Sequence, residues 1–139
     1  MYDALLRLLQ ASPVTHNPRI TDLKLYGRNA FRVKMQAMVA PTLTFQVWLN
    51  HNPRHTRFAY QLLSHGGALL RWDNAPHHLH LKTSFPHHFH DGQGRIVPSA
   101  LQGDALRDLV VVLAEIERFL STKPTRQSGT DPVTKAGWS

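Results

Sequence analysis

Hydrophobic and polar residues alternate through much of the first half of the chain, a pattern typical of strands that bury one face. The alternation is clearest at residues 31–39, where Phe31 and Val33 alternate with Arg32 and Lys34. The same pattern continues at residues 20–26, 43–49, 56–63 and 68–73. The turns between these segments are too short for crossover helices, so the pattern predicts an antiparallel meander of about four or five strands.

Helical periodicity marks both ends of this strand-rich region. Residues 2–11 carry four leucines on one face, which predicts a short N-terminal helix, and the prolines of residues 12–19 predict a connector after it. Residues 105–120 repeat apolar side chains at helical spacing after Asp104, a residue type that caps helix N-termini. We expect this long helix to cover the apolar face of the sheet, so the predicted fold class is α+β.

The length and the end of the apolar pattern predict the domain organisation. With 139 residues and a hydrophobic content of 42%, the chain can form one domain with a real core. From residue 122 onward, proline, serine, threonine, glycine and cations replace the apolar pattern. We therefore expect a single domain at residues 1–121 and a disordered basic tail at residues 122–139.

Composition narrows the chemistry and the kind of partner. Cysteine is absent, which excludes disulfides, thiolate metal sites and cysteine nucleophiles. The net charge of +7 favours a polyanionic partner such as RNA, DNA or an acidic protein. The apolar runs are too short to span a membrane and the N-terminus lacks a signal-peptide pattern, so we expect a soluble, cytoplasmic protein. The broad apolar stripe of the second helix leaves a homodimer open.

Six of the ten histidines fall within residues 71–90. The pentad Pro-His-His-hydrophobic-His occurs there twice, at residues 76–80 and 86–90. Histidine changes charge near neutral pH and can donate, accept or bind metal, so this density suggests acid-base or ligand chemistry. If the two pentads fold back on each other, several imidazoles would converge beside Asp73. The ordinary alternative is a solvated His-rich loop.

Alternation also predicts which side of the sheet carries these groups. If Leu70 and Trp72 point to the core, Arg71 and Asp73 lie on the opposite face. In a simple meander this face would also hold the cations of the earlier strands, Arg32, Lys34 and Arg57. The alternative reading is an ordinary solvated sheet face.

The motif R-W-D-N-A-P-H-H at residues 71–78, followed by F-P-H-H-x-H at residues 85–90, resembles the signature of the TumE-like toxins of toxin-antitoxin systems. A looser similarity extends over residues 20–120. The chain departs from the family pattern at Leu79 and His80, and at Phe89, where a basic residue is common. The resemblance implies a toxin with a cognate antitoxin, commonly a helix-turn-helix protein encoded next door, and it leaves the target open.

Together, the histidines and the net charge suggest a ribonuclease that needs no metal. Cleavage of an RNA phosphodiester needs a base for the 2'-hydroxyl, an acid for the leaving oxygen and cations for the phosphate. We nominate His78 and His88 as the acid-base pair, His90 as a third member and Asp73 as the group that orients an imidazole. The predicted phosphate and substrate contacts are Arg71, Asn74, His77, Lys82, His87, Arg95, Arg32, Lys34 and Arg57. Asn74 could instead shape the turn.

Two other functions use the same residues. A divalent metal could bind to Asp73, His78, His88 and His90 and activate water for a nuclease, or the cluster could modify a nucleotide substrate. Alternatively, the basic sheet face could sequester nucleic acid or an acidic partner without chemistry. No cofactor is expected under the first hypothesis, and activity that survives chelators would separate the first from the second.

Overall fold

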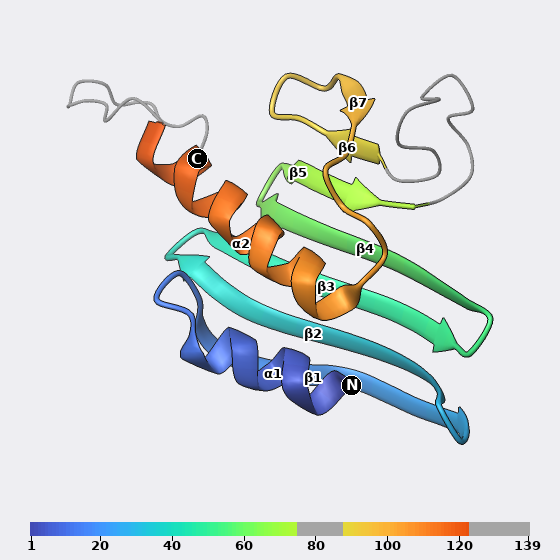
Figure 1. Cartoon of the computed structure of the whole chain (residues 1–139). Coiled ribbons are helices and arrows are strands. Elements are labelled where there is room, and N and C mark those ends of the chain that lie inside the picture. The colour runs from blue at the N-terminus through green and yellow to red at the C-terminus, as the bar shows by residue number, and fades with distance from the viewer. Residues whose placement is uncertain (75–87, 123–139) are drawn as a thin grey trace.

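The computed structural model describes residues 1–74 and 88–122 of the chain (Figure 1). In sequence order, the elements are α1 (Tyr2–Ala11), β1 (His16–Gly27), β2 (Ala30–Ala40), β3 (Leu43–Asn52), β4 (His55–Ser64), β5 (Gly67–Asp73), β6 (His88–His90), β7 (Ile96–Pro98) and α2 (Ala105–Thr122). The seven strands pair in sequence order, and each neighbouring pair is antiparallel. The predicted α+β fold, a meander with an N-terminal and a C-terminal helix, is confirmed.

The predicted count of four or five strands is wrong, because β6 and β7 extend the sheet beyond β5. Each of these strands has only three residues, which is too short for alternation to become visible in the sequence. They are recognisable only by their pairing with β5 and with each other. The last three residues of the second His pentad therefore form a strand of the sheet.

The connector predicted at residues 12–19 is also too long, because β1 begins at His16. Pro18 lies inside this strand, where it is tolerated because β1 is at the edge of the sheet and needs no partner on its outer side. The register shifts between His16 and Arg19, and Asn17 has a positive φ of 53°. The proline and this irregularity hide the start of the strand from a reading of the sequence.

Both helices lie on one face of the sheet, which buries the core (Figure 1). Alternate residues of β2 to β5 are buried there, as the pattern predicts. Leu5 and Leu9 of α1 and Leu109 and Ile116 of α2 are fully buried against them. The opposite face of the sheet carries no helix in the described part of the chain.

Trp72 of β5 connects this strand to α2 on the helix-covered face of the sheet. Its side chain is 1% exposed, and its indole Nε1 donates a hydrogen bond to Glu115 Oε1 at 2.8 Å. On the neighbouring strand, Phe89 stacks on the indole with ring centroids 4.9 Å apart. Because side chains alternate between faces, these contacts direct Asp73 of β5 and His88 of β6 to the open side.

The start of α2 is fixed by two carboxylates. Asp104 accepts a hydrogen bond from the Arg107 backbone N–H at 3.2 Å, which confirms the predicted N-cap. The buried Asp108 accepts from the backbone N–H groups of Gln102 and Gly103 at 3.0 and 2.7 Å. Burial, with Asp108 and Asp104 nearby, raises the pKa of the Tyr60 hydroxyl well above its ordinary value.

Over the two described ranges, neither helix has the length and apolarity needed to cross a membrane.

Candidate functional site

The open face of the sheet carries rows of polar side chains that run across the strands. The pairing registers place the following residues of β2 to β6 in one row: Lys34, Trp48, Ala59, Asp73 and His88. The adjacent row consists of Gln36, Gln46, Gln61, Arg71 and His90. Arg32 and Arg57 flank the first row on its other side, paired through Asn50. The expectation that Arg71 and Asp73 share a face with the cations of earlier strands therefore agrees with the registers.

A buried carboxylate, Asp73, lies at the centre of the histidine-containing end of this face. Its Oδ1 atom is 2.5 Å from His88 Nε2, and its Oδ2 atom is 2.6 Å from Arg71 Nε. His90 Nε2 is 3.6 Å from Oδ2. A buried carboxylate is costly unless it is paired and hydrogen-bonded, and here three nitrogen-bearing side chains surround it. We call Asp73, Arg71, His88 and His90 the Asp73 cluster.

The members of the Asp73 cluster differ in their access to solvent. The side chains of His88 and Asp73 are 2% and 5% exposed, whereas those of Arg71 and His90 are 35% and 31% exposed. The two imidazole rings meet edge to face, with centroids 5.0 Å apart. A ligand would therefore meet Arg71 and His90, while Asp73 and His88 would hold them from beneath.

Asn74 secures the end of β5 beside this cluster. Its Oδ1 atom accepts from the Phe58 backbone N–H at 2.9 Å, and its Nδ2 donates to the Thr56 carbonyl at 2.6 Å. The residue is 3% exposed. Its side-chain amide thus extends the β4–β5 ladder past Asp73. The residues that follow Asn74 lie outside the described part of the chain, so its predicted roles in the turn and in substrate binding stay predictions.

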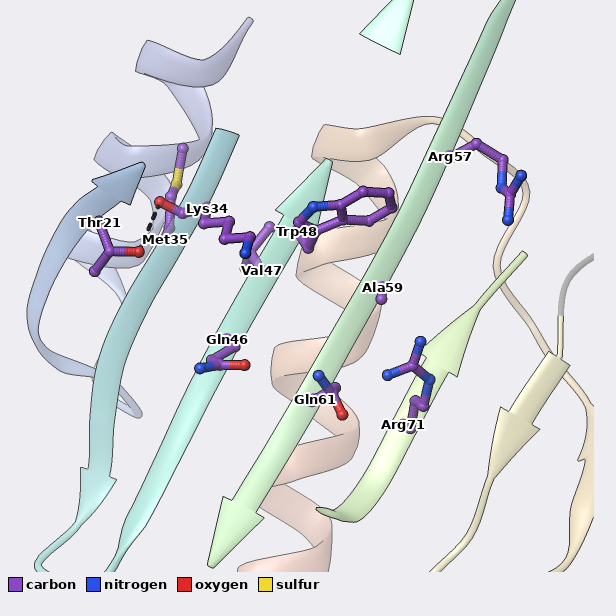
Figure 2. A pocket seen from close by; sticks show the side chains of 10 residues that line it. All are labelled: Thr21, Lys34, Met35, Gln46, Val47, Trp48, Arg57, Ala59, Gln61 and Arg71. Atoms are coloured by element: carbon purple, nitrogen blue, oxygen red, sulfur yellow. Dashed lines mark hydrogen bonds between the residues drawn. The ribbon is translucent and has the colours of Figure 1, made fainter. Parts of the chain in front are cut away.

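A pocket of about 470 Å³ opens on the same face, next to the Asp73 cluster (Figure 2). Its lining includes Lys34, Trp48, Arg57 and Arg71, with the small side chain of Ala59 between the strands. Arg71 belongs to both features, because its guanidinium reaches Asp73 while its side chain lines the pocket. The pocket and the cluster therefore form one continuous polar surface.

Besides Arg71, which pairs with Asp73, two of the cations predicted to bind substrate have acidic partners. Arg32 Nε lies 3.1 Å from Asp22 Oδ2, and Arg95 Nε lies 2.8 Å from Asp91 Oδ2 in the turn between β6 and β7. Backbone hydrogen bonding from Arg95 to the Asp91 carboxylate holds the pKa of that group below its ordinary value. Lys34 and Arg57 line the pocket instead. The remaining nominated residues, His77, His78, Lys82 and His87, together with His80, lie outside the described residues, so their roles stay predictions.

The Asp73 cluster also has the composition of a metal site. Asp73, His88 and His90 each offer one ligand atom, and these atoms lie within 4.8 Å of one another. Nitrogen and oxygen ligands bind zinc at about 2.1 Å, so two ligands of one ion are at most about 4.2 Å apart. The three side chains would have to close in slightly to hold an ion. Arg71 is already 2.6 Å from one carboxylate oxygen and would compete with it.

Trp48, Gln46 and Gln61 line the pocket, although the sequence pattern predicts no functional role for them. The alternation of residues 43–49 does put Trp48 on the polar side of its strand, where an indole is unusual. This indole on the polar side of the strand is the signal in the sequence that points to the pocket. The strand register is needed to show which side chains surround it.

Comparison with known proteins gave one family. The family model described as toxin TumE matches residues 5–120, most of the chain. Neither the curated proteins nor the solved structures gave a significant match.

Proposed function

The chain belongs to the TumE family of toxins, the toxin components of toxin-antitoxin systems, and from that premise we propose that it cleaves RNA at the Asp73 cluster without metal. The observation that carries this proposal is the buried Asp73 carboxylate held between Arg71, His88 and His90. Such a cluster combines groups that transfer protons with a fixed cation for developing charge on phosphate.

Accessibility suggests how the roles are divided. His90 is the imidazole of the cluster that reaches solvent, so it is the group that would exchange a proton with the RNA. His88 and Asp73 would position His90 and Arg71, and Arg71 would contact the phosphate. In cleavage, the 2'-oxygen loses its proton to a base and attacks phosphorus, and the leaving 5'-oxygen takes a proton from an acid. His90 would serve one of these steps, and His78 remains the nominated partner for the other.

Membership of a toxin family also implies an antitoxin partner. We propose that this antitoxin is a helix-turn-helix protein that binds the toxin directly, as in type II systems. The net charge of +7 favours an acidic binding segment on such a partner. An antitoxin that covers Arg71 and His90 would block the proposed site.

A metal-dependent nuclease is the second candidate, favoured by the convergence of Asp73, His88 and His90 within 4.8 Å. In that case the three residues would hold the ion, which would supply an activated water. We rank it lower because both carboxylate oxygens of Asp73 already have nitrogen neighbours at 2.5 and 2.6 Å. A cation would have to displace the Arg71 guanidinium from one of them.

The test is cleavage of a mixed RNA substrate by purified protein, with and without a chelator. We expect cleavage that resists the chelator and falls by about 10²- to 10⁴-fold in His90→Ala, the size of a general acid-base contribution. Asp73→Asn should also lose activity, because it removes the charge that positions Arg71 and His88. His65→Ala changes an exposed histidine in the turn between β4 and β5 and is the matched control.

Each other result points to a different function. Activity that disappears with the chelator and returns with a divalent metal would favour the metal site. If the wild-type protein cuts no RNA, the nuclease proposal is wrong. Toxicity that is lost on charge reversal at Lys34 and Arg57, yet survives His90→Ala, would favour a binding module without chemistry.

A further inference from the structure

Trp48 is an unusual residue type for the solvent-facing side of a sheet. In β3 the residues on either side of it, Val47 and Leu49, are buried on the helix-covered face. Alternation therefore puts Trp48 on the open face, between Gln46 and Asn50 of the same strand. The chain's other described tryptophan, Trp72, is in the core and hydrogen-bonded to Glu115. Among residues 1–74 and 88–122, the Trp48 side chain makes no hydrogen bond or ring contact comparable to those of Trp72.

The indole extends from β3 toward β4, where the paired residue is Ala59 (Figure 2). A larger side chain at position 59 would fill the space beside the ring, whereas alanine leaves it open to the pocket. Trp48 is only partly buried, so part of its aromatic surface remains accessible. The pocket therefore offers an aromatic surface next to empty space of about 470 Å³.

The surroundings of Trp48 are suited to an anion that carries a flat ring. Lys34 pairs with it from β2, and Arg57 of β4 and Arg71 of β5 line the same pocket. Among the described residues that line this pocket, none is acidic. Gln46 and Gln61 are paired on the neighbouring row, and their amides can both donate to and accept from the edge of a base.

The distance between Trp48 and the Asp73 cluster determines how far a bound base would lie from the cluster. Trp48, Ala59 and Asp73 are successive members of one row, so Trp48 and Asp73 are two strand spacings apart, roughly 10 Å between backbones. Arg71 bridges the interval, because it lines the pocket and contacts Asp73. A base stacked on Trp48 would therefore have Arg71 between it and the Asp73 carboxylate.

We propose that Trp48 is a stacking platform for one unpaired base of the substrate, and that the platform presents the adjoining phosphate to the Asp73 cluster. Bases inside a duplex are stacked on each other and cannot lie on a protein ring, so the substrate segment is single-stranded RNA. The link to cleavage rests on the proposed ribonuclease function. The binding step stands on the pocket itself and can be measured without cleavage.

The experiment measures binding of a short single-stranded RNA to protein carrying Asp73→Asn, which keeps the substrate intact. Stacking should quench the fluorescence of Trp48, and the Trp48→Phe protein reports the background from the other two tryptophans. Trp48→Ala should weaken binding between about fivefold and about 150-fold, the range for losing one stacked base. Trp48→Phe, which keeps a smaller ring, should lose less.

Three controls separate stacking from charge. Tyr26→Ala removes another aromatic residue, 53% exposed on β1 and next to Lys24, and should leave binding unchanged. An oligonucleotide with the same backbone but no bases should bind the parent and Trp48→Ala proteins equally. A duplex of the same sequence should not quench Trp48. Thermal unfolding confirms that each variant is folded.

The outcomes distinguish this proposal from the ribonuclease proposal. If Trp48→Ala binds the single strand as tightly as its parent, or the base-free strand quenches Trp48 equally, the platform does not exist, even where cleavage by the Asp73 cluster is intact. If Trp48-dependent binding is found but no RNA is cut, the platform stands and the cleavage proposal fails. A Trp48→Ala protein that binds RNA normally but loses its antitoxin would make this surface a protein-docking site and overturn the proposal.

Discussion

Replacing Asn74, which follows Asp73 in the sequence motif, distinguishes a structural role of this residue from a role in substrate binding. Its amide makes two hydrogen bonds to the backbone of β4, at 2.9 Å to Phe58 and 2.6 Å to Thr56. The residue is 3% exposed, so water cannot easily replace the amide. Asn74→Ala would remove both hydrogen bonds, of which the one from Phe58 is buried and the one to Thr56 is partly buried.

The size of the effect follows from these two contacts. Each hydrogen bond contributes about 1 kcal/mol, and each buried group left unpaired costs about 1–3 kcal/mol. Local relaxation recovers part of this, so we expect Asn74→Ala to lower the free energy of unfolding by about 2–4 kcal/mol. For a domain of this size, the melting temperature would fall by roughly 6–16 °C.

The assay is thermal and urea unfolding of Asn74→Ala and of Asn50→Ala, an exposed asparagine on β3. The control should change stability by less than about 0.5 kcal/mol. Asn74→Asp keeps the acceptor for Phe58 but turns an oxygen toward the Thr56 carbonyl, so it should also destabilise. If Asn74→Ala unfolds like the wild type yet loses toxicity, the structural role is wrong and Asn74 binds substrate.

Three further changes test the packing and the charges. Tyr60→Phe should leave stability unchanged or slightly higher in urea unfolding, because the buried hydroxyl has no hydrogen-bond partner among residues 1–74 and 88–122. Trp72→Phe removes the indole bond to Glu115 and should cost about 2–3 kcal/mol in the same assay, more than Glu115→Gln, which keeps an acceptor. The pKa of Asp91 is lowered in the fold, so its contribution to stability is present above the ordinary carboxyl pKa and is lost as the pH falls through the lower pKa of the folded state. The protection factors of amides in the β6–β7 turn, taken relative to the intrinsic exchange rate at each pH, should therefore fall in acid, and less so in Asp91→Asn.

Alternation alone was enough to predict the open face. The residue period of two, carried through β2 to β5, assigned Lys34, Arg71 and Asp73 to one side, and the short turns set the order of the strands. A meander of long strands with one buried face fixes both orientation and neighbours. The fold class and this face of the site were predictable for that reason.

The pairing of His88 with Asp73 could not be predicted in the same way. It depends on how a three-residue strand is registered on β5 after the stretch at residues 75–87, and no local pattern fixes that register. In the folded protein, the stacking of Phe89 on Trp72 fixes the register of β6 on β5. The role of Trp48 was hidden for a related reason, since its neighbours come from β2, β4 and β5 rather than from its own strand.

The position of β6 in the chain also sets the time at which the Asp73 cluster can form during synthesis. Residues 1–74, which include five of the seven strands, are made before His88 and His90. A nascent chain can therefore complete most of the sheet while its carboxylate still lacks both imidazoles. Helix α2, which holds Trp72 through Glu115, is translated later still. The Asp73 cluster can therefore form only after β6 has left the ribosome, later than the strands β1 to β5 that support it.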